Sequence, residues 1–228
     1  MDADVRAELI EATRDGLKAR LHWRARDRTS EVRAPLLGEV NLYNLLIVAA
    51  ELSARGRSQQ DIRQTLATLE PVPGRMQGLE TPNGALAVID YAHTPDALES
   101  ALKSLQALNP DRLWCLFGCG GDLDATKRPL MGRIAESLSD RVVLTNDNPR
   151  REEARSIVRA IQSGMRKPER AVIEFDRARA IAHALGQAED GDVVLIAGKG
   201  HETEQIIGDT HTFSSDLDTV QQWLRGAA

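Results

Sequence analysis

The sequence predicts an α/β fold whose larger part is a mostly parallel sheet with helices on both faces. From residue 86 onward, short apolar runs alternate with stretches whose apolar residues recur at helical spacing. The runs are apolar at consecutive positions, as in Val142-Val143-Leu144, which is typical of parallel strands buried on both faces. Residues 1–73 have a different pattern, so we expect them to belong to a separate unit.

The N-terminal part predicts strands first. Residues 16–23 alternate between polar and apolar side chains, residues 31–37 could pair with them, and residues 26–30 would form the turn. Because a two-stranded hairpin is marginal in water, we expect these strands to belong to a sheet whose remaining strands lie outside this sequence.

Two helices are predicted next. The first runs from about residue 38 to 55, with Asn41 and Asn44 near its N-terminus, and the second runs to about residue 69. Ser58 and Asp61 are spaced like a capping box at the start of the second helix. Residues 71–75 contain two prolines and a glycine, which favours a linker, and we place the boundary between residues 73 and 74.

The second part predicts five strands and five helices in alternation. Thr94 and Pro95 fit the N-cap and the first position of one of these helices. The strands are expected at residues 86–91, 112–119, 141–145, 171–175 and 192–197, and the helices at 95–108, 129–138, 152–165, 177–188 and 217–225.

Composition excludes several classes of function. The formal net charge of -5 gives no reason to expect nucleic acid or an anionic membrane as a partner. No apolar run approaches the ~18 residues of a membrane span, and the acidic N-terminus does not resemble a signal peptide, so we expect a cytoplasmic protein. Cys115 and Cys119 would be roughly 13 Å apart on a strand, too far for a disulfide, so we expect both to be reduced.

Four of the predicted strands end in loops rich in polar residues and glycine. Parallel strands bring such loops to one edge of the sheet, where ligands bind in open α/β folds. In one loop, Asp147 and Asn148 offer hydrogen-bonding groups, Pro149 stiffens the turn, and Arg150 offers a planar fork suited to a carboxylate. An ordinary turn explains the same residues, with Asp147 and Asn148 capping the next helix and Arg150 in solvent. The loops are residues 90–95, 118–122, 147–150 and 198–202.

For the glycines and histidines of these loops, the sequence favours structural roles. Gly118, Gly120 and Gly121 lack the dinucleotide-binding spacing and favour a tight turn. His93 and His201 have no second metal-ligand motif nearby, so we expect hydrogen-bonding histidines and no metal site.

Two observations on the sequence concern phosphate binding. Lys127 and Arg128 favour a solvated basic turn over a phosphate clamp. The sequence also contains no G-x-x-x-x-G-K-[ST] motif, so any ATP phosphates would be held by other groups.

Taken together, the motifs resemble the Mur ligase family. Their order and spacing match over roughly residues 30 to 225. The matching motifs are Gly38-x-x-Asn41-x-x-Asn44, Pro73-Gly74-Arg75, residues 90–96, 117–122 and 127–132, Asp147-Asn148-Pro149-Arg150 and residues 197–202.

The resemblance implies that the two parts of the chain have different roles. Residues 1–73 would be the tail of a central ATPase domain, and residues 74–228 a Rossmann-like domain that brings the incoming amino acid. The family reaction is an ATP-dependent amide ligation through an acyl phosphate, with the UDP-muramoyl dipeptide as acceptor and ATP and Mg²⁺ held mainly by the central domain. We therefore expect a monomer that binds ligands weakly and ligates nothing as this chain alone.

The resemblance also implies roles for individual residues. Asn41 and Asn44 resemble adenine-side positions. Arg75, Asp90 and His93 resemble groups near the ribose and phosphates, and no catalytic residue is assigned. The positions that resemble the site for the third substrate are Asp147, Asn148, Pro149, Arg150, Gly198 and Glu202.

The Asp-Asn-Pro-Arg form resembles the family members that add meso-diaminopimelate, as opposed to lysine. Those members usually read Gly-Gly-Asp-Arg-Asp, whereas this chain has Leu123 at the arginine position. Losing one charge-assisted hydrogen bond costs about 1.5–3 kcal/mol, so Lys127 or Arg128 would have to compensate, or binding would be weak.

Three alternatives remain open from the sequence. The first is a non-catalytic Rossmann-like module that binds a ligand. The second is the lysine-adding ligase, against which Arg150 argues, and the third is the folylpolyglutamate type, against which the whole motif argues.

Overall fold

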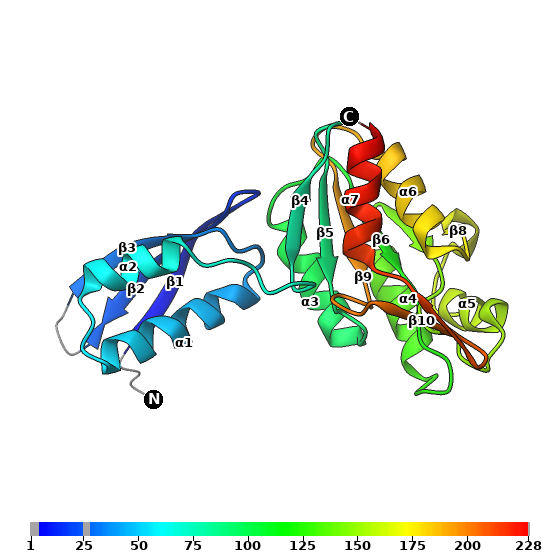
Figure 1. Ribbon diagram of the computed structural model, residues 1–228, viewed down its shortest axis with the longest axis horizontal. Coiled ribbons are helices and arrows are strands. Elements are labelled where there is room, and N and C mark those ends of the chain that lie inside the picture. Colours follow the sequence, from blue (N-terminus) through cyan, green and yellow to red (C-terminus); the bar gives the residue numbers. More distant parts are fainter. Residues whose placement is uncertain (1–4, 25–27, 228) are drawn as a thin grey trace. The chain divides into compact units, whose positions relative to one another are not determined.

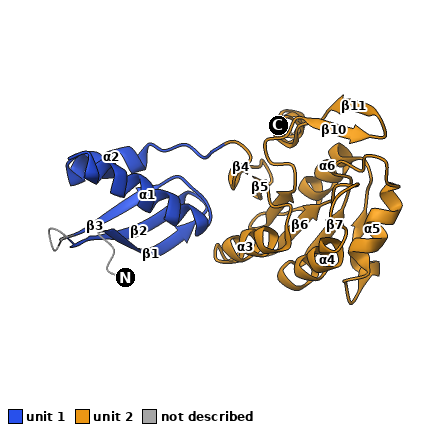
Figure 2. Ribbon diagram, turned by 90° about the horizontal axis from the view of Figure 1, so that it is seen from below, with its two compact units in different colours: residues 1–72 blue, residues 73–228 orange. Residues whose placement is uncertain are grey.

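The structure is a computed structural model that describes residues 5–24 and 28–227. It divides the chain into two compact units, residues 1–72 (unit 1) and residues 73–228 (unit 2), which are coloured separately in Figure 2. Each unit is described by itself. The predicted turn at residues 26–30 lies partly outside the described residues.

Unit 1 contains a three-stranded antiparallel sheet of order β1-β2-β3, formed by β1 (Val5–Thr13), β2 (Gly16–Trp23) and β3 (Arg28–Ala34). The strand predicted at residues 16–23 and its pairing with the following segment are confirmed. The expectation that the other strands lie outside the sequence is wrong for β1. Its exposed and less exposed residues alternate only as far as Leu9, because a register shift between Leu9 and Glu11 interrupts the pattern.

Two helices, α1 (Val40–Ala54) and α2 (Gln59–Ala67), pack on this sheet. They bury Leu45, Ile62 and Leu66 against the strand residue Leu21, all at 0–1% exposure. The predicted capping box is confirmed, because Ser58 Oγ accepts from the Asp61 amide at 3.1 Å and an Asp61 carboxylate oxygen accepts from the Ser58 amide at 3.2 Å.

Unit 2 is built on a six-stranded sheet of order β4-β5-β9-β6-β7-β8. All neighbouring strands are parallel except β4, which pairs antiparallel with β5. The mostly parallel sheet predicted from the sequence is therefore confirmed (Figure 1). The strands are β4 (Gln77–Glu80), β5 (Leu86–Asp90), β6 (Leu113–Phe117), β7 (Arg141–Leu144), β8 (Val172–Ile173) and β9 (Val193–Ala197).

Helices cover both faces of this sheet, with α3 and α4 on the face opposite α6 (Figure 2). Thr94 caps α3 as predicted, since its hydroxyl accepts from the Ala97 amide at 3.3 Å and Pro95 opens the helix. The helices are α3 (Pro95–Gln106), α4 (Lys127–Leu138), α5 (Ala154–Gln162), α6 (Arg177–Gln187) and α7 (Asp216–Ala227), with a 3₁₀ turn, η2 (Pro168–Arg170), after α5.

Three strands of unit 2 were not predicted. They are β4 and an antiparallel hairpin of β10 (Glu204–Ile207) and β11 (Thr210–Phe213). No residue of the hairpin is fully buried, so its sequence has no apolar face to give a periodic signal. Cys115 and Cys119 are both free and buried, as expected for reduced cysteines.

Candidate functional site

Four loops of unit 2 leave the same edge of the sheet. They follow β5, β6, β7 and β9, which are adjacent and parallel, so their carboxyl ends point the same way (Figure 1). This is the arrangement expected from the alternation of strands and helices. The polar residues of these loops therefore face a common region at the carboxyl edge.

Asn148 connects two of these loops with the β10–β11 hairpin. Its Oδ1 accepts from the Ile206 amide at 3.0 Å and from Lys199 Nζ at 3.3 Å, and its Nδ2 donates to Glu202 Oε2 at 3.3 Å. The helix after this loop begins at Ala154 with Glu153 as its N-cap. The alternative that Asp147 and Asn148 cap that helix is therefore wrong.

Arg150 is half-buried in the same loop, and its backbone lies in the left-handed region at φ 51°. Its amide donates to the Ile206 carbonyl at 3.0 Å, and its Nη1 donates to the Gly121 carbonyl at 2.8 Å. Within residues 5–24 and 28–227, no carboxylate pairs with this guanidinium. The alternative that Arg150 points into solvent is wrong, and its remaining N–H groups can meet an anionic ligand.

The loop after β9 requires a glycine where it approaches Asp147. Gly198 has φ 114°, and a Cβ there would lie 2.8 Å from Asp147 Oδ2. Pro149 is buried. Its carbonyl oxygen lies so close to Gly121 that a Cβ on Gly121 would be only 1.9 Å away from it. Gly198 and Pro149 thus fix how closely three of the loops pack.

Lys199 is fully buried beside Gly198, and no local pattern marks it as a site residue. Its ammonium group donates to the Glu204 carbonyl and to Asn148 Oδ1, and it lies 4.0 Å from Glu202 Oε2. Burial lowers the pKa of Lys199, while Asp147 and Glu202 oppose that shift. Glu202 therefore sits in a polar network and still keeps partial exposure.

Tyr91 gathers several predicted residues around its ring. The Arg75 guanidinium lies 4.6 Å from the ring centroid, and the rings of His93 and His201 lie at 4.6 and 5.4 Å. Burial raises the pKa of Tyr91, as does the nearby Glu202 carboxylate. Tyr91 directly follows β5, and no local pattern marks it as a site residue.

Asp90 shapes the chain next to Arg75. Its Oδ2 accepts from the Met76 amide at 2.8 Å and its Oδ1 from the Ala92 amide at 2.9 Å. Burial raises the pKa of Asp90, while the two backbone amides and Arg75 oppose the shift. Met76 has φ 44°, so the Asp90 bond holds a strained turn that fixes the backbone of Arg75.

Asn41 and Asn44 belong to unit 1 and interact with each other. Asn41 Nδ2 donates to the Leu37 carbonyl at 2.7 Å, and Asn44 Nδ2 donates to Asn41 Oδ1 at 2.8 Å. Asn44 is exposed at the first turn of α1. Both asparagines are placed near the helix N-terminus, as predicted.

The expectation that Lys127 and Arg128 form a solvated turn is wrong for Arg128. Its guanidinium is 3% exposed and bonds both oxygens of Glu152 at 2.7–2.8 Å and the Gly120 carbonyl at 3.1 Å. Glu152 also accepts from the Asp122 amide at 2.7 Å. Arg128 therefore supports the glycine-rich loop and is not free to replace an arginine at Leu123.

A buried ion pair lies beneath this edge. Arg177, at the start of α6, bonds both oxygens of Asp216 at 2.7–2.8 Å and donates to the carbonyls of Asn146 at 3.3 Å and Ala197 at 2.9 Å. It thereby links the ends of β7 and β9 with α7. Burial by itself would lower the pKa of Arg177. The charge of Asp216 and its hydrogen bonds raise that pKa by more, so the net shift is upward.

Within residues 5–24 and 28–227, no group of three or more His, Cys, Asp and Glu side chains could hold a metal ion. No helix among those residues is long and apolar enough to cross a bilayer.

The fold and the edge loops define an α/β domain whose candidate site lies at the carboxyl ends of parallel strands. Residues 74–200 match the family described as Mur ligase, glutamate ligase domain. This chain belongs to the Mur ligase family.

Two relatives come from Vibrio species. A UDP-N-acetylmuramoyl-L-alanyl-D-glutamate–2,6-diaminopimelate ligase from Vibrio parahaemolyticus is 46% identical over 193 residues, which are 85% of this chain and 39% of that protein. The ligase of the same name from Vibrio vulnificus gives the same figures. The chain thus spans about two fifths of the length of these relatives.

Solved structures agree with the fold. A solved structure of a UDP-N-acetylmuramoyl-L-alanyl-D-glutamate–2,6-diaminopimelate ligase is 36% identical, with a TM-score of 0.75, and the match covers 98% of this chain and 46% of that chain. A UDP-N-acetylmuramate-alanine ligase from Thermotoga maritima is 17% identical with a TM-score of 0.70, covering 99% of this chain and 46% of that one. The second likeness shows the fold alone.

Proposed function

We propose that this chain is the C-terminal part of an ATP-dependent amide ligase that adds meso-diaminopimelate to UDP-N-acetylmuramoyl-L-alanyl-D-glutamate. The observation that supports the proposal is that Arg150 and Glu202 belong to loops at the same edge of the sheet, where Asn148, two residues before Arg150, donates to Glu202 Oε2. A guanidinium without a carboxylate partner suits the far carboxylate of diaminopimelate, and a partly exposed carboxylate suits an ammonium group. The names of the relatives support the same substrates.

In this proposal, Arg150 and Asn148 orient the incoming amino acid, and Glu202 and Asp147 attract its ammonium groups. ATP transfers its terminal phosphate to the acceptor's D-glutamyl carboxylate and leaves as ADP. The amine of the incoming amino acid, once its ammonium form has lost a proton to solvent, attacks the acyl carbon. The acyl C–O bond then breaks, and the phosphate leaves with the bonding electron pair. Arg75 and His93 lie around Tyr91, where a cation and a ring can contact a nucleotide. Asp90 acts indirectly, by fixing the turn that carries Arg75.

The proposal assigns no magnesium-dependent step to this chain. Within residues 5–24 and 28–227, no cluster of acidic side chains fits a hard cation that needs several oxygen ligands. The sequence also contains no P-loop motif to cradle ATP phosphates. We therefore propose that this chain binds the amino acid and that phosphate activation depends on other groups.

Calorimetric titration with meso-diaminopimelate and with L-lysine tests the proposal. The chain should bind diaminopimelate more tightly, because lysine has no second carboxylate for Arg150. In Arg150→Met, the dissociation constant for diaminopimelate should rise at least tenfold, since a charge-assisted hydrogen bond contributes about 1.5–3 kcal/mol. Arg151→Met is the matched control, because the Arg151 side chain is exposed and, among the described residues, pairs only with Asp209, at 3.8 Å, while its amide bond to Asp122 is kept in the variant.

The Leu123→Arg variant sharpens the same test. Leu123 is 53% exposed beside Gly120, with its Cδ1 3.0 Å from the position of a Gly120 Cβ. An arginine there should tighten diaminopimelate binding and leave lysine binding unchanged. Equal binding of the two amino acids by the wild-type chain, or an unchanged affinity in Arg150→Met, would contradict the proposal.

A further inference from the structure

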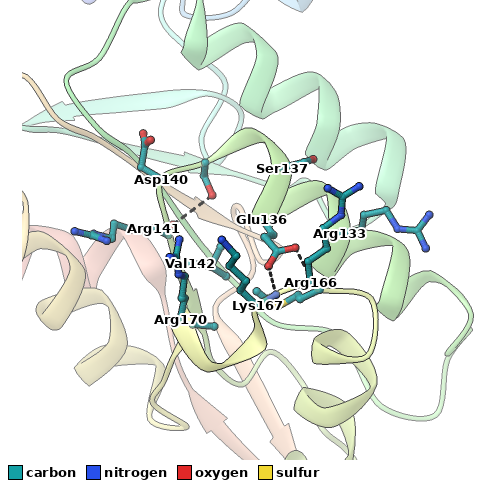
Figure 3. A pocket seen from close by; sticks show the side chains of 12 residues that line it. Arg133, Glu136, Ser137, Asp140, Arg141, Val142, Arg166, Lys167 and Arg170 are labelled. Atoms are coloured by element: carbon teal, nitrogen blue, oxygen red, sulfur yellow. Dashed lines mark hydrogen bonds between the residues drawn. The ribbon is translucent and has the colours of Figure 1, made fainter.

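A cavity lies at the amino-terminal edge of the sheet of unit 2, opposite the edge that carries the candidate site. Its volume is about 780 Å³, within the range of small-molecule sites. The second half of α4, the start of β7, the loop after α5 and η2 line it (Figure 3). Because Arg141 opens β7 and the loop with Asp147 and Arg150 follows its other end, this cavity is separate from the edge described above.

Five cationic side chains line the cavity, against two acidic ones, in a chain whose net charge is -5. Figure 3 shows them drawn around the pocket. Within the described residues, none of the five cationic head groups forms a hydrogen bond or an ion pair, whereas Arg112, Arg128 and Arg177 of the same unit all have carboxylate partners. The five are Arg133, Arg141, Arg166, Lys167 and Arg170.

The two acidic side chains bind backbone amides. Glu136 on α4 accepts from the amides of Arg166 at 2.6 Å and Lys167 at 2.7 Å, one with each oxygen (Figure 3). Asp140 Oδ2 accepts from the Leu113 amide at 2.8 Å. Glu136 therefore fixes the loop that carries two of the cations and does not pair with their head groups.

Two glycines hold the same wall close together. A Cβ at Gly164 would lie 1.8 Å from the Pro129 carbonyl oxygen, and one at Gly132 would lie 2.1 Å from the Ile161 carbonyl oxygen. The chain after α5 thus packs directly on α4. The cations project from a packed frame of α4, β7 and this loop, so their backbone positions are set before any ligand binds.

We propose that this cavity binds an anion that carries two or more phosphate groups. Four guanidinium groups supply planar forks that match phosphate oxygens, and the lysine adds a point charge. The C-terminus of α4 contributes partial negative charge, so binding depends on the side chains and not on helix amides. A chain of linked phosphates can engage several cations at once, which a single carboxylate cannot. The site is independent of the proposed ligase function, because no residue is shared.

Calorimetric titration of the 228-residue chain with inorganic tripolyphosphate at low ionic strength tests this site. We expect saturable one-to-one binding that weakens as salt is raised. The dissociation constant should rise at least tenfold in Arg141→Ser/Arg166→Ser and also in Arg133→Ser/Arg170→Ser. All four arginines are exposed, so the variants should fold, and circular dichroism melting checks this. Arg63→Ser, an exposed arginine of α2 in unit 1, is the control and should bind as the wild type does.

A parallel titration with cytidine diphosphate distinguishes the two sources of linked phosphates. If cytidine diphosphate binds more tightly than tripolyphosphate, and both double variants lose that binding, the ligand is a nucleotide. Weaker binding identifies an inorganic oligophosphate. Absence of binding by both compounds, or equal affinity in wild type and in both double variants, would overturn the proposal.

Discussion

The two units use charged residues in opposite ways. In unit 1, Arg20 reaches Glu8 and Glu31 across the outward face of a sheet, and 40–60% of each side chain is exposed. In unit 2, Arg177 and Asp216 form an ion pair that is 1–2% exposed and connects the ends of β7 and β9 with α7. Exposed pairs contribute little to stability, whereas a broken buried pair leaves an uncompensated charge. Only the buried charges can therefore fix the geometry of a site.

The strands of the two units differ for a related reason. Strands β6 and β9 are buried along their whole length because helices cover both faces of their sheet. Strand β2 instead alternates between buried and partly exposed residues. A sheet with two covered faces leaves its loops at the strand ends as the places where polar residues can meet a ligand. Unit 2 accordingly places its candidate site at a sheet edge.

The largest effect is expected from Arg177→Met. Removing the arginine leaves Asp216 buried and unpaired, so the free energy of unfolding of unit 2 should fall by about 3–5 kcal/mol. Urea unfolding followed by amide hydrogen exchange would assign the loss to unit 2. In Arg20→Met, the matched variant of the exposed pair, the stability of unit 1 should barely change. Similar losses in both variants would contradict the comparison.

A somewhat smaller effect is expected from Leu66→Ala in unit 1. Leu66 is fully buried in the core between α2 and the sheet, and such truncations cost about 2–5 kcal/mol. Hydrogen exchange should show faster exchange in unit 1 and unchanged protection in β5, β6 and β9. Equal loss of protection in both units would show that they unfold together.

Two helix caps provide a finer test. Ser58→Ala in α2 and Thr94→Ala in α3 should each lower stability by roughly 1 kcal/mol. The loss should be greater for Ser58, because its capping box contains two reciprocal bonds, whereas Thr94 accepts one bond at 3.3 Å. Thermal unfolding of each unit, monitored through its NMR signals, would show which of the two variants loses more stability. A greater loss in Thr94→Ala would show that burial of α3 outweighs the number of cap bonds.

The smallest effect concerns pH. Hydrogen bonds from Arg128 and from the Asp122 amide lower the pKa of Glu152 below its ordinary value of 4.5. Because the folded pKa is the lower one, this stabilisation is present above pH 4.5 and is lost as the pH falls through the folded value. In Glu152→Gln, the stability of unit 2 should depend less on pH in that acidic range. An NMR titration of the Glu152 carboxyl checks the shift, and an ordinary pKa there would contradict it.

Much of the fold could be predicted from local patterns. Consecutive apolar residues indicated the buried strands of unit 2, and Ser58, Thr94 and Pro95 indicated helix starts. Strand β1 and the β10–β11 hairpin could not be predicted in this way. A register shift between Leu9 and Glu11 interrupts the alternation of β1, and the hairpin has no buried face that would give a periodic apolar signal.

Part of the candidate site could also be predicted from local sequence. Asp147, Asn148, Arg150 and Glu202 lie directly after strands, so the direction of the strands was enough to bring them to one edge. The contributions of Arg128, Lys199 and Tyr91 depend on contacts between residues far apart in sequence, such as Arg128 with Glu152. No local pattern specifies such contacts.

The sequence by itself determined the alternation of strands and helices, the motif family, and the edge at which the polar loops gather. These follow from side-chain periodicity and strand direction, which are local properties. The tertiary structure decided that Arg128 and Arg177 are buried partners of carboxylates, that Arg150 keeps N–H groups without a carboxylate partner, and that five cations share a cavity at the opposite edge. Burial and pairing depend on which distant segments pack together, and the chain fixes that packing only once it has folded.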